Sequence, residues 1–142
     1  MRKLIPFLAI IILLSACSKK DSTNNTVSST LSGTWMNSAW GGTANNTIKF
    51  SFSSDGGAGI VSQLGSSPWG FSVGDALYSN VTSTGNGTYS GNGKYTYGTN
   101  NTSSSYAPVT LMLQNNGSTL FAHYAQDAST GITPPDYYYQ KQ

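Results

Sequence analysis

Apolar and polar residues alternate with a period of two along much of the chain from Leu31 onward. The clearest run is 48–52, where Ile48, Phe50 and Phe52 fall on one face of an extended chain. This period is typical of half-buried β-strands, whereas an amphipathic helix repeats every 3.6 residues or so, about twice as long. No segment combines a helical period with helix caps. The pattern therefore predicts an all-β domain.

About eight or nine strands are expected, joined by short turns. The expected strands are 31–35, 48–52, 60–64, 69–78 with a bulge at 74–75, 88–89, 94–97, 109–113, 120–124 and 137–141, and the clearest turns are 54–57, 91–93 and 115–117. Such turns favour an antiparallel meander, and closing it into an up-and-down β-barrel removes its two exposed edges. A two-sheet sandwich is the competing architecture. A barrel of about eight strands has room inside for side chains or for one small ligand.

The segment 1–16 has the layout of a secretory signal, since Arg2 and Lys3 precede an apolar run at 4–14. That run is too short to span a bilayer as an ordinary transmembrane helix. It ends at Leu14-Ser15-Ala16-Cys17, which resembles the lipobox of bacterial lipoproteins. The resemblance implies that the chain is cut before Cys17 and that this cysteine carries lipid. Because Ser18 rather than Asp follows, it also implies the outer membrane of a Gram-negative bacterium, with the leaflet left open.

The expected organisation is a signal peptide at 1–16, an acylated cysteine and polar tether at 17–30, and one domain at 31–142. Cleavage would leave five lysines and five aspartates, with no arginine and no glutamate, so the net charge would be five minus five, or zero. Without a basic patch, binding to a phosphate backbone has no electrostatic source. We therefore expect no nucleic-acid partner, and contact with a membrane only through the N-terminal lipid.

The segment Leu31-Ser32-Gly33-Thr34-Trp35 carries a second resemblance. Its Gly-x-Trp is similar to the mark on the first strand of the calycins, which comprise lipocalins, fatty-acid-binding proteins and avidins. The layout of lipobox, tether and Gly-Thr-Trp strand resembles that of bacterial lipoproteins with a small lipocalin-like domain. The resemblance implies a lipocalin-like barrel in which Trp35 closes one end and Lys141 packs across its indole.

Aromatic residues are the main functional signal. Trp40 and Trp69 lie in or beside Gly-rich stretches, where loop aromatics at a barrel mouth can contact a ligand. Asp75 interrupts an apolar strand and marks either a bulge or loop, or a polar group inside a ligand cavity. The residues expected to line the interior are Trp35, Phe50, Phe52, Phe71 and Leu111.

Nothing in the sequence amounts to an active site. His123 is the only histidine, and Cys17 is assigned to lipid, so a zinc site or an activated nucleophile lacks its usual residues. We therefore expect no catalytic residue, no metal and no cofactor. The predicted protein is a non-enzymatic, lipid-anchored barrel of the cell envelope that holds a small apolar or aromatic ligand or acts structurally. The alternative is an interaction module that binds glycan or protein through exposed aromatic residues.

Overall fold

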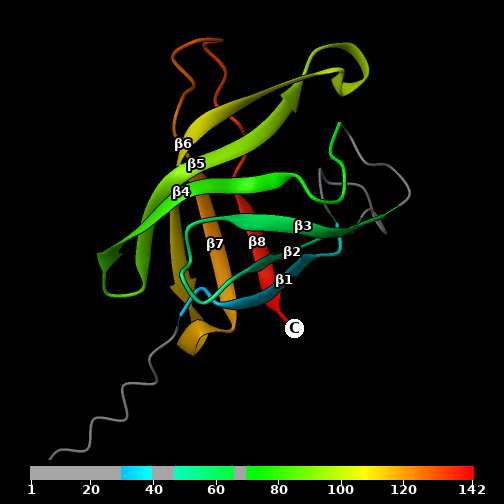
Figure 1. Cartoon of the computed structure of the whole chain (residues 1–142). Helices are drawn as coiled ribbons and strands as arrows, with labels where there is room; N and C mark the ends of the chain where they lie inside the picture. The colour runs from blue at the N-terminus through cyan, green and yellow to red at the C-terminus, as the bar shows by residue number, and fades with distance from the viewer. Residues whose placement is uncertain (1–29, 40–46, 66–69) are drawn as a thin grey trace, which may run out of the picture.

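The computed structural model describes residues 30–39, 47–65 and 70–142, and these ranges form one closed antiparallel barrel (Figure 1). The strands are β1 (Gly33–Asn37), β2 (Ile48–Phe52), β3 (Gly59–Leu64), β4 (Ala76–Gly85), β5 (Thr88–Tyr97), β6 (Ser103–Gln114), β7 (Thr119–Tyr124) and β8 (Tyr137–Lys141). Each strand pairs with the next one in sequence, and β8 returns to β1. The predicted all-β barrel is confirmed, and the chain does not form the two-sheet sandwich.

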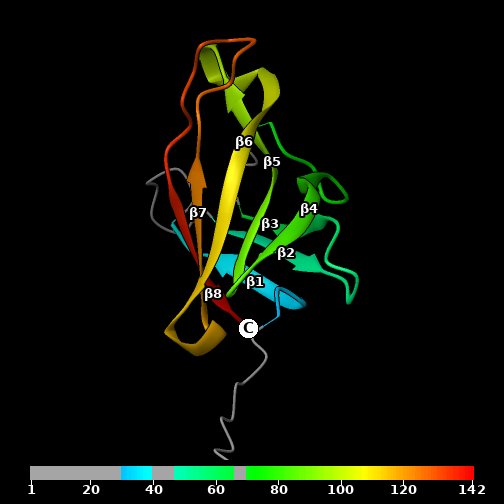
Figure 2. The same ribbon diagram turned by 90° about the vertical axis from the view of Figure 1, so that its left-hand side faces the viewer.

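Pairing is uneven around the barrel. β5 and β6 pair along the whole length of β5, whereas β3 and β4 pair only at Gly59–Tyr78 and Ile60–Ala76. The long β5–β6 hairpin therefore projects from the body of the barrel. Figure 2 shows this hairpin and the 125–136 connection between β7 and β8 at the same end of the molecule.

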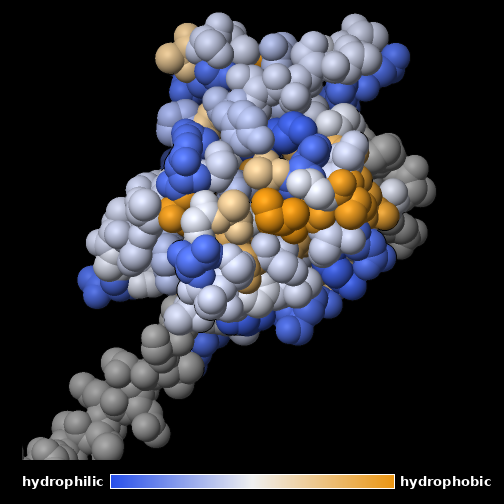
Figure 3. Space-filling view, in the orientation of Figure 1, coloured by the Kyte–Doolittle hydropathy of each residue, from blue (hydrophilic) through white to orange (hydrophobic). Residues whose placement is uncertain are grey.

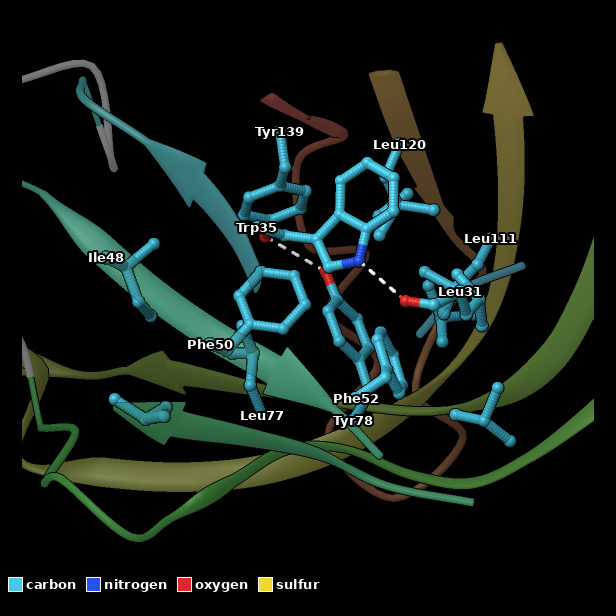
Figure 4. Packing of buried hydrophobic residues seen from close by; sticks show 14 of the residues in the cluster. Leu31, Trp35, Ile48, Phe50, Phe52, Leu77, Tyr78, Leu111, Leu120 and Tyr139 are labelled. Carbon is cyan, nitrogen blue, oxygen red and sulfur yellow. Dashed lines mark hydrogen bonds between the residues drawn. The ribbon is translucent and has the colours of Figure 1, made fainter. Parts of the chain in front are cut away.

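Large side chains fill the middle of the barrel. Phe50, Tyr78 and Tyr139 are fully buried, and the Phe50 ring centroid lies 5.3 Å from that of Tyr78 and 4.8 Å from that of Tyr139. The Tyr78 hydroxyl donates to the Tyr139 hydroxyl at 2.9 Å, and Trp35 Nε1 donates to the Leu31 carbonyl at 2.8 Å (Figure 4). Edge-to-face ring contacts of this kind stabilise a core beyond the area that they bury.

The Gly-x-Trp segment has a packing role on β1. Gly33 has φ +117°, and a Cβ at this position would lie 3.1 Å from Lys141 Cε. The missing side chain lets the lysine stem cross β1, so that Lys141 Nζ lies 5.2 Å from the Trp35 ring centroid. This is the contact that the calycin resemblance implies. The same amine donates to the Thr30 carbonyl at 3.3 Å, which ties the start of the described domain to its last strand.

Two local predictions are wrong. No turn interrupts 91–93, because β5 runs through it and the chain reverses at 86–87 instead. The expected strand that includes Phe71 does not form either, since 70–75 contains turns and irregular chain. Backbone bonds from Gly74 N to the Val61 carbonyl, and from Val61 N to the Asp75 carbonyl, both 2.8 Å, fasten this segment to β3.

The face of the molecule shown in Figure 3 is mostly polar, and its apolar side chains gather over β3. The exposed large apolar residues of the described ranges include Ile60 on β3 and Val73 in the turn beside it. In the part of the chain that the structure describes, no helix has the length and apolar character needed to cross a bilayer.

Candidate ligand-binding cavity

A cavity of about 580 Å³ lies at one end of the barrel. Its walls come from the end of β1, the end of β5, the short helix η2 (Thr99–Asn101), the segment before β4, and the 125–136 connection with the start of β8. The lining residues are Asn37, Ala39, Phe71, Tyr95, Thr96, Asn101, Ile132, Thr133, Pro134, Pro135, Asp136, Tyr137 and Tyr138. The volume falls in the range of small-molecule sites, about 300–1,000 Å³.

Four aromatic rings and two prolines give the cavity an apolar lining. The rings belong to Phe71, Tyr95, Tyr137 and Tyr138. Phe71 and Tyr95 are almost fully buried, and burial raises the pKa of Tyr137 to about 12. Burial also raises the pKa of Tyr95, so the phenols of Tyr95 and Tyr137 stay neutral at ordinary pH. The Tyr137 ring lies 6.1 Å from that of Tyr124, so this lining residue also packs against the core.

Asp127 holds the 125–136 connection against the barrel. It is 5% exposed, and its Oδ2 accepts hydrogen bonds from the hydroxyls of Tyr95 and Ser105, both at 2.7 Å. Its Oδ1 accepts from the backbone N–H of Ser129 at 2.8 Å and from the Ser129 hydroxyl at 2.7 Å. The donors of Tyr95, Ser129 and Ser105 hold the pKa of Asp127 well below its usual value. A carboxylate that accepts several hydrogen bonds stays ionised, as this one does.

Asp136 supplies the one carboxylate of the described lining. His123 Nδ1 lies 3.0 Å from its Oδ1 and 3.1 Å from its Oδ2, and the Tyr124 backbone N–H donates to Oδ1 at 3.2 Å. Because a carboxylate only accepts, Nδ1 is the protonated nitrogen of His123. This pair lies at the rim, where both side chains are exposed.

Lys94 and Asp75 form an ion pair at 2.6 Å. Lys94 Nζ also lies 5.5 Å from the Phe71 ring centroid. The hydrogen bond from Lys94, with a second from the Ser72 backbone, holds the pKa of Asp75 below its usual value. Asp75 directly precedes β4 and is not part of the lining, which matches the bulge-or-loop alternative rather than the cavity alternative.

The other predicted site residues divide into three groups. Phe71 lines the cavity, whereas Phe50 and Phe52 are buried in the core and do not line it. Trp35 and Leu111 also belong to that core. The predicted contacts Trp40 and Trp69, like the lipidation site Cys17, lie outside the described residues.

Sequence reasoning missed Tyr95, Asp127 and Asp136 as site residues. The one local signal for Asp127 is the Asp-x-Ser spacing to Ser129, which is typical of a side chain that bonds the backbone two residues ahead. Nothing local indicates its bonds to Tyr95 and Ser105, which lie 32 and 22 residues away in the sequence.

Among residues 30–39, 47–65 and 70–142, no three His, Cys, Asp or Glu side chains come close enough to hold a metal ion. Comparison with protein-family models, with curated proteins and with solved structures gives no match for this chain.

Proposed function

We propose that this protein is a lipid-anchored lipoprotein of the bacterial cell envelope whose barrel holds a small, ring-bearing ligand without transforming it. The observation that carries the ligand proposal is the cavity of about 580 Å³ at the end of a barrel whose middle is filled by side chains. Pockets that combine apolar and aromatic walls with a few polar groups are the usual sites for small molecules.

The lining favours a flat apolar body with some hydrogen-bonding groups at its edge. Rings from Tyr95 and Tyr137 offer faces for stacking, and polar residues such as Thr96 and Asn101 also line the cavity. No lysine or arginine belongs to the described lining, so the carboxylate of a fatty acid would find no cation there.

The anchor proposal rests on the sequence before the domain. Two or three acyl chains on Cys17 would hold the protein firmly at a membrane, since each buried methylene contributes about 0.8 kcal/mol. The localisation follows from the lipobox and from Ser18, and an outer-membrane site in a Gram-negative bacterium is the form that we propose.

A blocking substitution in the full chain tests the ligand proposal. Thr133 is exposed and lines the cavity, so Thr133→Trp should occupy the space without disturbing the core. Thr84→Trp, at an exposed position of β4, is the matched control. Native mass spectrometry of protein purified from its own envelope should find a bound small molecule on wild type and Thr84→Trp. Thr133→Trp should lose it. Bare masses for all three would contradict the proposal.

A second candidate is recognition of a glycan or a protein by the outer face of β7 and β8. The Tyr138 side chain is 55% exposed, and its ring lies 4.6 Å from that of Phe121. Exposed paired rings suit stacking on a sugar or a partner side chain. Phe121 does not line the cavity, so Phe121→Ser separates the two candidates. Loss of a partner with retention of the small ligand would favour this second function.

A further inference from the structure

The geometry points to an organic cation as the ligand: a protonated amine or quaternary ammonium on a small ring-bearing body, with its charge beside Asp136. The inference rests on the proposed function and names the chemistry that the cavity selects. Three features of the cavity support it: the charges around it, the acceptor capacity of Asp136, and the aromatic rings that can bind a cation.

The charges at this end of the barrel are predominantly negative. Asp136 is in the lining, and Asp127 lies directly behind the lining residue Tyr95. Asp127 is bound only by neutral donors, and in the described ranges no cation pairs with it. A buried carboxylate without a counter-ion projects its field into neighbouring space, because little water intervenes to screen it.

The described lysines do not offset this charge. Lys94 is paired with Asp75. Lys141 lies over Trp35, at the far end of β8 from Tyr137. Lys49 alternates with the inward residues of β2 and so belongs to its outer face. Asp136 has the His123 ring at 3.0 Å, and Asp127 has no cationic partner in the described ranges. A cation entering the cavity is therefore attracted by these two carboxylates, whereas an anion is repelled by them.

Asp136 retains capacity to accept a hydrogen bond from a ligand. A carboxylate offers about four acceptor positions over its two oxygens. The His123 ring N–H is shared between both oxygens, and the Tyr124 backbone N–H takes one position on Oδ1. An ammonium group at Oδ2 would thus add a charge-assisted hydrogen bond without displacing either existing donor.

The rings complete a cation site. Cations bind over the faces of aromatic rings, and cages of such rings recognise quaternary ammonium groups. Tyr137 follows Asp136 in the chain, and both line the cavity. The Tyr95 hydroxyl donates a hydrogen bond to the Asp127 carboxylate. This bond increases the electron density of the Tyr95 ring and so strengthens the attraction of the ring for a cation. An uncharged ligand of equal shape would gain the stacking contacts but neither electrostatic contribution.

Three probes of nearly equal shape test the inference on the full chain in a mild detergent, with detergent-only titrations subtracted. They are phenethylamine, 2-phenylethanol and 3-phenylpropionate, which carry a cation, a neutral hydroxyl and an anion. Isothermal titration calorimetry should give phenethylamine an affinity at least roughly tenfold above that of the alcohol, with no measurable binding of the anion.

Asp136→Asn should reduce phenethylamine to the affinity of the alcohol and leave the alcohol unchanged. The matched control is Asp55→Asn, which removes the same charge from an exposed turn between β2 and β3 and should leave both affinities unchanged. Tyr137→Leu provides a second variant, at a half-buried position of the lining, and it should weaken the binding of the amine more than that of the alcohol.

Equal binding of amine and alcohol to wild type would overturn the cation inference and leave the ligand-binding proposal standing. An unchanged preference for the amine in both Asp136→Asn and Tyr137→Leu would also overturn it. If no probe binds and the native mass is bare, both proposals fall.

Discussion

Two glycines of β5 lie where any side chain would clash with a neighbouring part of the barrel. A Cβ on Gly93 would lie 2.4 Å from Tyr124 Cε1, and one on Gly91 would lie 2.9 Å from the Ser79 carbonyl oxygen. Both distances are shorter than real side chains tolerate. The Tyr124 ring therefore crosses the barrel interior directly onto the backbone of β5, and its position depends on the absence of a side chain there.

Gly93→Ala should destabilise the protein by about 1–3 kcal/mol, because the added methyl forces a rigid, fully buried ring to move. Gly57→Ala is the control, since a Cβ there meets nothing within 4 Å and its φ is not positive. Urea denaturation gives both free energies of unfolding. Equal values for the two variants would show that the Tyr124 contact is not what requires glycine at position 93.

Asp127 makes the stability of the folded protein depend on pH. Its pKa is lowered in the folded protein by Tyr95, Ser129 and Ser105, whereas in the unfolded chain it returns to an ordinary value of about 3.9. The unfolded chain therefore binds this proton more readily as the pH falls. The stabilisation is fully present above the unfolded pKa and is lost as the pH drops toward the folded one.

Unfolding free energies measured from about pH 5 to about pH 2 should fall more steeply for wild type than for Asp127→Asn, which lacks this titrating group. At neutral pH the variant should be the less stable protein, because an amide replaces an ionised acceptor of four hydrogen bonds. Parallel pH dependences in the two proteins would contradict the assignment of Asp127 as a group ionised by its donors.

The alternation of apolar and polar residues correctly located those strands that have one buried face and one solvated face. The expected ranges 48–52 and 137–141 coincide with β2 and β8. Alternation failed in β5, because Gly91-Asn92-Gly93 has the composition of a turn, whereas the two glycines here make room for Ser79 and Tyr124. Their role depends on a partner distant in sequence, and no local pattern carries that information.

The candidate site was less predictable than the fold, because it too depends on contacts between segments that are distant in sequence. Its walls are a connection, two strand ends and a short helix that meet only when the barrel closes. Phe71 was expected to face the interior and does line the cavity, although the strand expected around it does not form. Asp136 is placed by its contact with Tyr124 on the neighbouring strand, which is a consequence of the β7–β8 pairing.

The whole molecule has two unlike ends. At one, Lys141 packs over Trp35 and donates to the carbonyl of Thr30, where the described chain begins. At the other, Asn37 and Tyr137 line the cavity, because β1 runs toward it and β8 runs away from it. A lipid attached before residue 30 would therefore join the domain at the end with Trp35 and Lys141. The cavity would face away from the point of attachment, where a water-borne ligand can enter.

Acylation of Cys17 can be tested by metabolic labelling. If Cys17 is acylated, cells fed labelled palmitate should incorporate the label into wild type and not into Cys17→Ser, whereas Ser28→Ala in the tether should label normally. The mass of the purified wild-type protein should equal that of residues 17–142 plus acyl chains. Since the acyl chains supply the membrane affinity, wild type should sediment with the envelope even at high salt, which weakens only electrostatic attachment. An unlabelled wild type, or an N-terminus other than Cys17, would refute the anchor while leaving the barrel and its cavity intact.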